Sequence, residues 1–220
     1  MTRRFHTKTF EKIDEARRES ILSVAIREFA DKGFNGTSIN GLARKAGVSI
    51  GSLYSYFHSK DELFLTVCAK GHDLLEHALS DIDPSRGLFS EYRTMLTRAR
   101  DYAKSNPELN LIYLDATTQG LRHLAKRLSS SLESVTAKLY ERLLEAAART
   151  GEIRRDIEPG AAAFCLDNLI VLFQFSFCSD YYRDRLRIFL GLADDQEIDE
   201  DGLIEAILDF VQAAMKGKAL

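Results

Sequence analysis

The sequence predicts an all-α protein, and three observations predict it. Apolar residues recur at helical spacing along most of the 220 residues, no stretch alternates strictly as a β-strand does, and the breaks fall at Asn, Pro and Gly. A hydrophobic content of 45% is that of a globular chain with a sizeable core. We expect an N-terminal three-helix unit with a helix-turn-helix, joined to a larger helical domain.

The first 13 residues form a basic extension before the first long helix. Four basic side chains lie in it: Arg3, Arg4, Lys8 and Lys12. Such an arm either reaches a groove or the phosphates of DNA, or it frays, and the sequence leaves both readings open. The helix that follows is expected over residues 14–32, with a core face made of Ile21, Leu22, Ala25, Ile26 and Phe29.

Residues 37–60 have the pattern of a helix-turn-helix. A short first helix shows the apolar spacing i, i+3, i+4 and i+7 at Ile39, Leu42, Ala43 and Ala46. Gly47 provides the positive φ that ends a helix tightly, and Ser49 can cap a second helix over residues 50–56. Leu53 and Phe57 would face the core. The outward side then carries hydroxyls, aromatic rings and no carboxylate, which suits close approach to DNA.

The next helix begins at a capping box, Ser59 to Glu62. We expect it to continue to about Leu79 and to join the two domains without a flexible linker. Lys60 lies in its first turn, where a cation opposes the helix dipole but suits a phosphate. That mismatch favours a functional role for Lys60.

Further helices are expected near residues 88–104, 107–127, 129–149, 160–182, 184–190 and 201–217. Their limits are indicated by Asn106-Pro107, Thr150-Gly151, Glu158-Pro159-Gly160 and Gly191.

Residues of about 14–68 resemble the DNA-binding domain of TetR-family transcriptional regulators. An ordered series of residues carries the resemblance: Ile21, Ala25, Phe29, Gly33-Phe34, Thr37-Ser38-Ile39, Leu42-Ala43, Ala46-Gly47-Val48-Ser49, Gly51, Leu53-Tyr54, Tyr56-Phe57 and Ser59-Lys60-Asp61-Glu62-Leu63. Tyr56 departs from the pattern, since many relatives have histidine there. The resemblance implies a homodimer whose C-terminal domain, here residues 69–220, binds a small molecule that changes DNA affinity.

The charge distribution agrees with DNA binding by the N-terminal part. Residues 1–60 carry 11 Lys and Arg against 6 Asp and Glu, a net charge of +5, whereas the whole chain has −3. Basic charge near a helix-turn-helix favours contact with phosphates. Two other classes stay open: a helical protein–protein adaptor, and a DNA-organising protein without an effector.

Eleven residues are the candidates for contact with double-stranded DNA at a near-palindromic operator. We expect Ile50, Gly51, Ser52 and Ser55 nearest the base edges, and mainly phosphate contacts from the others: Thr37, Ser38, Arg44, Ser49, Tyr54, Tyr56 and Lys60.

Residues 161–177 are apolar almost all round and therefore need partners on more than one side. The C-terminal helix has a similar surface, so we expect both to form a symmetric four-helix dimer interface. The alternative is a central helix within a monomer.

An effector site is expected where polar groups stand among apolar ones on two helices. The candidates are Tyr113, Gln119, His123, Phe164, Asn168 and Phe173, and the aromatic rings among them suit a small hydrophobic or aromatic effector.

Other chemistry is sparse. Cys68, Cys165 and Cys178 lack metal-ligand spacing and are expected to be buried, reduced thiols, with a redox sensor as the alternative. No catalytic or phosphate-binding motif occurs, so we expect no enzyme, no cofactor and no metal. Without a signal peptide or a membrane-spanning run, a cytoplasmic location is expected. The function predicted is a dimeric, ligand-responsive regulator, and repression is favoured over activation.

Overall fold

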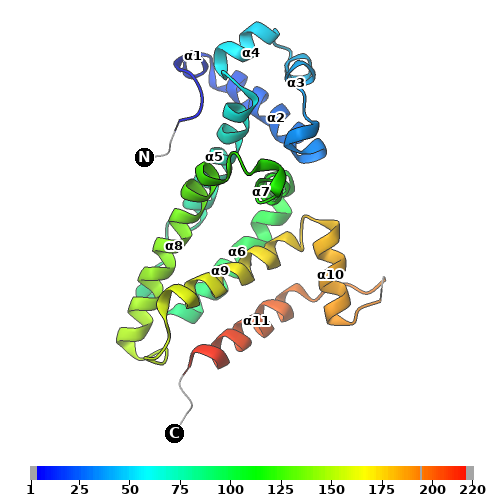
Figure 1. The fold of residues 1–220 in the computed structure, drawn as a ribbon. Helices are drawn as coiled ribbons and strands as arrows, with labels where there is room; N and C mark the ends of the chain where they lie inside the picture. The colour runs from blue at the N-terminus through cyan, green and yellow to red at the C-terminus, as the bar shows by residue number, and fades with distance from the viewer. Residues whose placement is uncertain (1–3, 194, 217–220) are drawn as a thin grey trace. The chain divides into compact units, whose positions relative to one another are not determined.

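The structure, a computed structural model, describes residues 4–193 and 195–216, with the backbone alone at residues 119, 125, 126 and 128–134. The described residues form helices and no strands (Figure 1). Their bounds are α1 Lys8–Lys12, α2 Glu15–Gly36, α3 Ile39–Lys45, α4 Ile50–Tyr56, α5 Lys60–Ala78, α6 Leu88–Ser105, α7 Pro107–Ala116, α8 Ala125–Thr150, α9 Pro159–Phe175, α10 Asp180–Leu190 and α11 Glu200–Met215, with short 3-10 helices at Pro84–Arg86 and Gln119–Leu121. The all-α prediction is confirmed.

The chain divides into two compact units. The first comprises residues 1–77 and 108–133, and the second comprises residues 78–107 and 134–220. The expected division at residue 68 differs from this one, because α7 and the start of α8 pack with the N-terminal helices.

The core of the first unit is built on aromatic rings. Phe64 of α5 meets Phe29 and Phe34 of α2 edge-to-face, each with ring centroids 5.1 Å apart. Ile112 and Ala116 of α7 belong to the same buried cluster. Such ring pairs add to the free energy gained by burying apolar area. Helix α4, through Leu53, therefore packs on a core to which segments far apart in the sequence contribute.

The helix expected over residues 107–127 is wrong in its second half. The α-helix ends at Ala116, and a turn and a short 3-10 helix follow before α8. Thr117 ends α7 in part by its own side chain, whose Oγ1 donates to Leu114 O at 2.8 Å. Threonine side chains compete with the helical backbone in this way.

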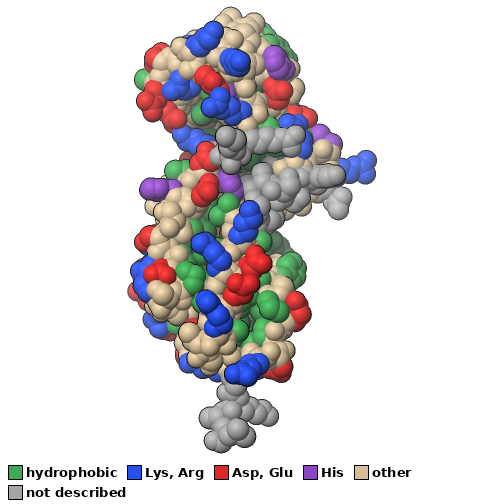
Figure 2. All heavy atoms as spheres, turned by 90° about the vertical axis from the view of Figure 1, so that its left-hand side faces the viewer, with side chains coloured by type: hydrophobic (Ala, Val, Ile, Leu, Met, Phe, Trp, Pro, Cys, Tyr) green, Lys and Arg blue, Asp and Glu red, His purple; other side chains and the backbone are tan. Residues whose placement is uncertain are grey.

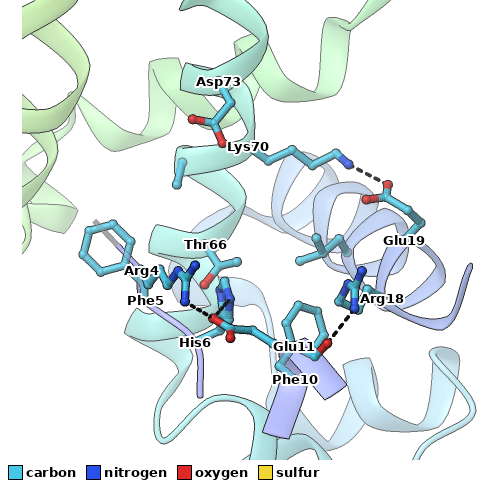
Figure 3. Close-up of a pocket in the computed structure, with 12 residues that line it drawn as sticks. Arg4, Phe5, His6, Phe10, Glu11, Arg18, Glu19, Thr66, Lys70 and Asp73 are labelled. Carbon is cyan, nitrogen blue, oxygen red and sulfur yellow. Dashed lines mark hydrogen bonds and ion pairs between the residues drawn. The ribbon is translucent and has the colours of Figure 1, made fainter. Parts of the chain in front are cut away.

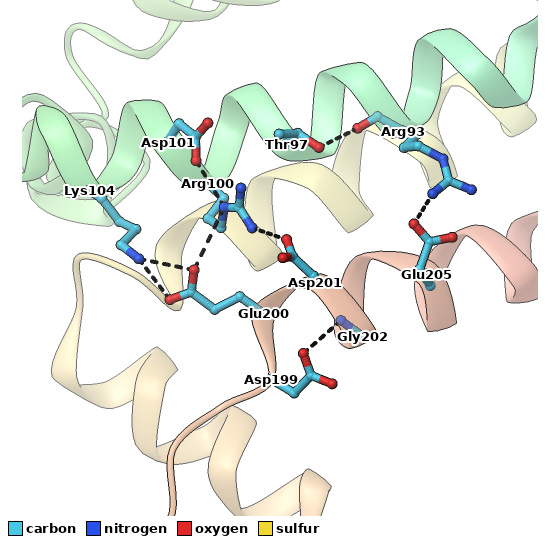
Figure 4. A network of polar contacts seen from close by, with 10 residues as sticks. All are labelled: Arg93, Thr97, Arg100, Asp101, Lys104, Asp199, Glu200, Asp201, Gly202 and Glu205. Carbon is cyan, nitrogen blue, oxygen red and sulfur yellow. Dashed lines mark hydrogen bonds and ion pairs between the residues drawn. The ribbon is translucent and has the colours of Figure 1, made fainter.

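In the second unit α6 packs against both α9 and α11. The buried Tyr92 of α6 donates its hydroxyl to Leu166 O of α9 at 2.9 Å. Ion pairs hold α6 to α11 on the surface (Figure 4): Lys104 Nζ lies 2.9 Å from Glu200 Oε1, and Arg100 binds Asp201. The N-terminal turn of α11 is thereby fixed along α6.

The helix expected over residues 160–182 is broken. α9 ends at Phe175, and α10 begins at Asp180 after a bend of 107°. Ser176 donates its Oγ to Leu172 O at 3.1 Å at the end of α9. No single described helix is long and apolar enough to cross a membrane; α9 and α10 reach the required length and composition only when counted together across their bend.

The cysteines differ in exposure. Cys68 is buried, and burial raises the pKa of its thiol to about 12. Cys178 is half-buried, and burial raises its pKa to about 11. Cys165 is exposed on α9, so the expectation of a buried thiol is wrong for this residue.

Candidate DNA-binding surface

The helix-turn-helix forms as its sequence predicts. Gly47 has φ 62°, and Val48 N donates to Ala43 O at 3.0 Å across the turn. Arg17 of α2 donates to Gly47 O at 2.6 Å, which fixes the turn from the side. Ser49 caps α4 by accepting from Ser52 N at 2.9 Å. These contacts set the angle between α3 and α4 without help from DNA.

The outward face of α4 carries most of the residues expected near the base edges. Ile50 is 45% exposed and Tyr54 47%, and Gly51 and Ser55 are exposed beside them. Ser52 is half-buried, and its hydroxyl lies 2.8 Å from Ser49 Oγ. A short helix with small side chains around two exposed apolar groups can approach base edges closely.

The N-terminal extension is folded over residues 4–13, so the frayed-tail reading is wrong there. Thr7 N donates to Tyr56 O at 2.9 Å, and Thr7 Oγ1 donates to Ser55 O at 2.7 Å. Both acceptors are carbonyls of the last turn of α4, which a helix leaves without internal partners. Phe10 of α1 is buried 4.7 Å from the ring of Phe57. The extension thus caps the C-terminal end of the recognition helix.

Ion pairs hold the same extension near a hollow of about 910 Å³ beside α2 and α5 (Figure 3). Arg4 and Glu11 pair at 2.8 Å, and His6 Nε2 lies 3.5 Å from the same carboxylate. Arg18 of α2 donates to Glu11 O at 2.8 Å. These contacts keep Arg4 on the protein, whereas Lys8 and Lys12 are exposed.

Two of the expected phosphate contacts have partners inside the protein. Thr37 is 3% exposed, and its hydroxyl donates to Gly33 O at 2.8 Å and lies 3.0 Å from Glu28 O. Lys60 Nζ donates to Phe34 O at 2.7 Å and to Thr37 O at 3.1 Å, and it lies 4.3 Å from the centroid of the Phe34 ring. The position of Lys60 in the first turn of α5 is therefore explained by the carbonyls at the end of α2.

An open hollow of about 500 Å³ nevertheless brings four of the expected residues together. Thr37, Ser38, Tyr54 and Lys60 line it, with Ile39, Asn40, His58 and Ser59. The sequence-based prediction did not include Asn40 and His58, which are exposed. Their polar side chains, next to the starts of α3 and α5, were a sequence signal for a DNA contact. Arg44, Ser49, Ile50, Gly51, Ser52, Ser55 and Tyr56 lie outside the hollow.

The capping box before α5 is altered. As expected for a capping box, Glu62 N donates a hydrogen bond to Ser59 Oγ at 3.2 Å. The Glu62 carboxylate, however, accepts a hydrogen bond from His58 N at 2.8 Å. The carboxylate reaches one residue further back than in a standard box. The backbone N–H of His58, at the edge of the hollow, is therefore already bonded.

Two lysines of the first unit pair with one buried carboxylate. Lys32 and Lys45 both bind the buried Glu28, and these hydrogen bonds hold the pKa of Glu28 below its usual value. Figure 2 shows acidic and basic side chains interspersed over one face, with no single basic field. Lys32 and Lys45 are thus engaged within the protein, while the net charge of +5 for residues 1–60 already includes Glu28.

The expected effector residues fall into both units. In the first unit His123 Nε2 lies 3.6 Å from Asp61 and its ring packs beside Phe34, Tyr113 is half-buried, and the side chain of Gln119 lies outside the described residues. In the second unit Phe173 is buried, whereas Phe164 is 70% exposed and Asn168 donates to Phe164 O. Phe164 and Asn168 share the exposed side of α9, opposite to Phe173.

Residues 21–67, which run from within α2 through α3 and α4 to the start of α5, match the family described as bacterial regulatory proteins, tetR family. Residues 21–67 form a DNA-binding domain of the TetR family. This family consists of regulators rather than enzymes, which confirms the expectation that the chain is not an enzyme. The likeness covers the same helices whose capping and packing are described above.

Relatives and solved structures extend the TetR likeness. The regulator RutR of Escherichia coli O157:H7 is 30% identical over 124 residues, 54% of this chain and 57% of RutR. The chain thus matches little more than half the length of this relative. A TetR-family regulator from Chloroflexus aurantiacus has a TM-score of 0.72 at 22% identity, covering 97% of this chain and 99% of that one. FadR of Bacillus subtilis, solved in complex with stearoyl-CoA, has a TM-score of 0.71 at 15% identity. The match covers 88% of this chain and 97% of FadR. At these identities the likeness shows the fold.

Proposed function

We propose that this TetR-family chain is a dimeric regulator of transcription that binds a near-palindromic operator and is released from it by a small molecule. The observation that carries the proposal is α4, a capped helix whose outward face shows Ile50, Gly51, Tyr54 and Ser55 without a carboxylate. Two such helices related by a two-fold axis would read two related half-sites.

We assign the contacts to DNA as follows. Ile50, Gly51 and Ser55 face base edges, with Ser52 behind them, and Ser38, Tyr54 and Arg44 contact phosphates from the surrounding surface. Lys60 keeps one ammonium hydrogen for a phosphate while it binds Phe34 O and Thr37 O. Thr37 has a structural role in this surface and makes no DNA contact, because its hydroxyl already donates to Gly33 O. Ser49 and Tyr56 remain proposed phosphate contacts.

The proposed dimer interface is the exposed apolar side of α9 and α11. Phe164 and Leu172 on α9 are 70% and 43% exposed, and Phe210 on α11 is 67% exposed. Large rings at this exposure in one unit are typical of a surface that a partner covers. A homodimer that buries both helices would also remove Cys165 from solvent. Dimers of the chain at micromolar concentration are therefore expected in light scattering.

The proposed effector site lies in the core of the second unit. Tyr140 of α8 is 1% exposed, and its hydroxyl has no hydrogen-bond partner among the described atoms. Burial holds the pKa of Tyr92 and Tyr140 above the usual value, so both hydroxyls stay protonated. An unpaired buried hydroxyl costs about 1–3 kcal/mol, and a ligand that accepts a hydrogen bond from it would recover that free energy. The fit is to an apolar effector with one polar acceptor.

Release would follow from a difference in affinity. A ligand that favours a spacing of the two α4 helices unlike that of the operator weakens DNA binding by its preference between the two states. Repression is the simplest outcome for a protein that leaves its operator when the effector arrives, and the site of action would be the cytoplasm, where the chromosome lies.

Selection of the purified protein against random duplex DNA tests the proposal. Enrichment of a near-palindrome is the expected result, and it would also give the operator. A protein that binds duplexes without preference would be a DNA organiser. A protein that passes through a heparin column without retention would be an adaptor. Either outcome would overturn the proposed function.

A further inference from the structure

The hollow of about 910 Å³ beside α2 and α5 lies within the first unit alone (Figure 3). Three segments form its wall: the N-terminal extension, α2 and α5. Phe5, Phe10 and Leu22, all buried, give the wall an apolar part, and charged side chains stand around them. A hollow of this volume, apolar with a few polar groups, has the size and lining of a small-molecule site.

Arg18 of α2 brings unused hydrogen-bond donors to this hollow. Its Nη1 donates to Glu11 O at 2.8 Å and to Ile13 O at 2.7 Å, and these two bonds fix the plane of the guanidinium. Nε and Nη2 carry the other three N–H groups, and within the described residues no carboxylate binds them. One N–H of each points in parallel, the arrangement that binds both oxygens of a carboxylate. Half of a bidentate ion pair is thus already in place.

The other two strong cations of the wall already have acidic partners. Arg4 pairs with Glu11 at 2.8 Å, and Lys70 pairs with Glu19 at 2.5 Å. Asp73 adds a third carboxylate to the wall. A ligand with one negative charge therefore suits the open guanidinium, whereas the three carboxylates would repel a dianion such as a phosphate monoester. The charges of the wall favour a carboxylate ligand.

His6 gives a second sign of an occupant. Its Nδ1 is buried without a hydrogen-bond partner among the described atoms, while its Nε2 lies 3.5 Å from Glu11. Buried polar atoms are paired in the great majority of cases, so an unpaired one in the wall of a hollow indicates that an occupant or its water supplies the partner. The rings of Phe5 and Phe10 in the same wall suit a flat aromatic body.

We propose that this hollow binds a small aromatic carboxylate, whose oxygens pair with Arg18 Nε and Nη2 and whose ring packs on Phe5 and Phe10. Every lining residue lies in the first unit, so the site is distinct from the effector site proposed in the second. Thr7 of the extension binds the last turn of α4, and a ligand that holds the extension therefore also holds that turn. The effect on DNA, which rests on the proposed function, is tighter binding, the opposite of release.

Isothermal titration calorimetry with 2-naphthoate tests the site on the whole chain without DNA. The control ligand is 2-naphthamide, which has the same rings and no charge. The parent protein should bind the amide about 10- to 100-fold more weakly than the acid, because charge-assisted hydrogen bonds are lost. Arg18→Gln should abolish this difference between the two ligands.

Arg18→Gln also removes the bonds to two carbonyls of the extension, so a second variant leaves Arg18 intact. Ala69→Phe places a ring in the hollow from α5 and should raise the dissociation constant of the acid by about tenfold or more. Arg27→Gln removes the same charge as Arg18→Gln from an exposed position of α2 outside the hollow, and the constant should stay within about twofold. Circular dichroism verifies the folding of each variant.

Hydrogen exchange of the Thr7 N–H measures the hold on α4, since this group donates to Tyr56 O. With the acid at about 100 times its dissociation constant, exchange should slow by up to about 100-fold. Equal affinities for acid and amide, or an affinity for the acid that survives both Arg18→Gln and Ala69→Phe, would overturn the site. Binding without slower exchange would overturn the coupling to α4. Neither measurement uses DNA, so a failure to select an operator would leave both results standing.

Discussion

Asp115 Oδ2 accepts a hydrogen bond from Phe34 N at 2.8 Å, which ties α7 to the end of α2. The bond lies directly after Gly33, whose φ of 66° puts a kink in α2. A Cβ atom at residue 33 would lie 3.5 Å from the same carboxylate oxygen. Phe34 therefore links three elements at the kink of α2: its N–H binds Asp115 of α7, and its carbonyl accepts from Lys60 of α5. We call this set of contacts the joint.

Removing this carboxylate should loosen the joint. We expect Asp115→Ala to lower the free energy of unfolding by about 1–2 kcal/mol, because the N–H of Phe34 loses a charged acceptor. Urea denaturation measures the change. Asp31→Ala removes a carboxylate from the exposed surface of α2 and should change the free energy of unfolding little. Equal losses in the two variants would show that the joint is unimportant.

Lys60 should matter before any DNA is present. Lys60→Met keeps the side chain's stem but removes the ammonium from Phe34 O and Thr37 O, so the expected loss is about 1 kcal/mol of stability. DNA affinity should fall for all sequences alike, with a smaller salt dependence. Lys8→Met removes the same charge from an exposed site of α1 and serves as the control. A stable Lys60→Met protein would contradict the intramolecular role.

The N-terminal extension should be required for the recognition helix. Phe10→Ala leaves a cavity beside Phe57, and we expect it to cost about 3 kcal/mol. Thermal unfolding together with operator binding gives the measurement. The neighbouring Thr9→Ala alters an exposed side chain and should leave both unchanged. Full DNA affinity in a chain that lacks residues 1–13 would count against the extension as a support for α4.

Acid should weaken the second unit through Asp81. The hydrogen bonds from Arg98 hold the pKa of Asp81 at about 2, below its usual value of 3.8. A carboxyl group with a lowered pKa in the folded state stabilises the protein at pH values above its unfolded-state pKa. That stability is lost as pH falls from about 4 toward 2. Denaturation midpoints at successive pH values should therefore fall less steeply between pH 4 and 2 in Asp81→Asn than in the parent protein. Identical slopes would exclude a contribution from this pair.

Tyr92 and Tyr140 should respond in opposite directions to loss of the hydroxyl. Tyr92→Phe breaks the bond to Leu166 O and should cost about 1 kcal/mol. Tyr140→Phe removes an unpaired buried hydroxyl and should raise stability by about 1 kcal/mol. Each variant controls for the other, because both delete one oxygen from a buried ring. Destabilisation by Tyr140→Phe would mean that its hydroxyl has a partner in the unliganded protein.

Local rules predicted the helix-turn-helix well. Ser49, Gly47 and the apolar spacing of α3 act within a few residues, so the sequence alone carries their information. The roles of Thr37 and Lys60 could not be predicted, because both depend on carbonyls that the kink at Gly33 brings into reach. The breaks after Ala116 and Phe175 were missed for a similar reason: Thr117 and Ser176 are tolerated in helices, and tertiary packing decides whether their hydroxyls end one.

The first unit is discontinuous in sequence, and this bears on how the protein is made. A nascent chain that has reached residue 77 already contains α4, but it still lacks Ile112, Ala116, Leu121 and Leu124 of the shared core. The core is complete only once Leu124 has been synthesised. Truncated products that end earlier would thus carry the recognition helix without a finished scaffold, and they would compete poorly with whole molecules for an operator.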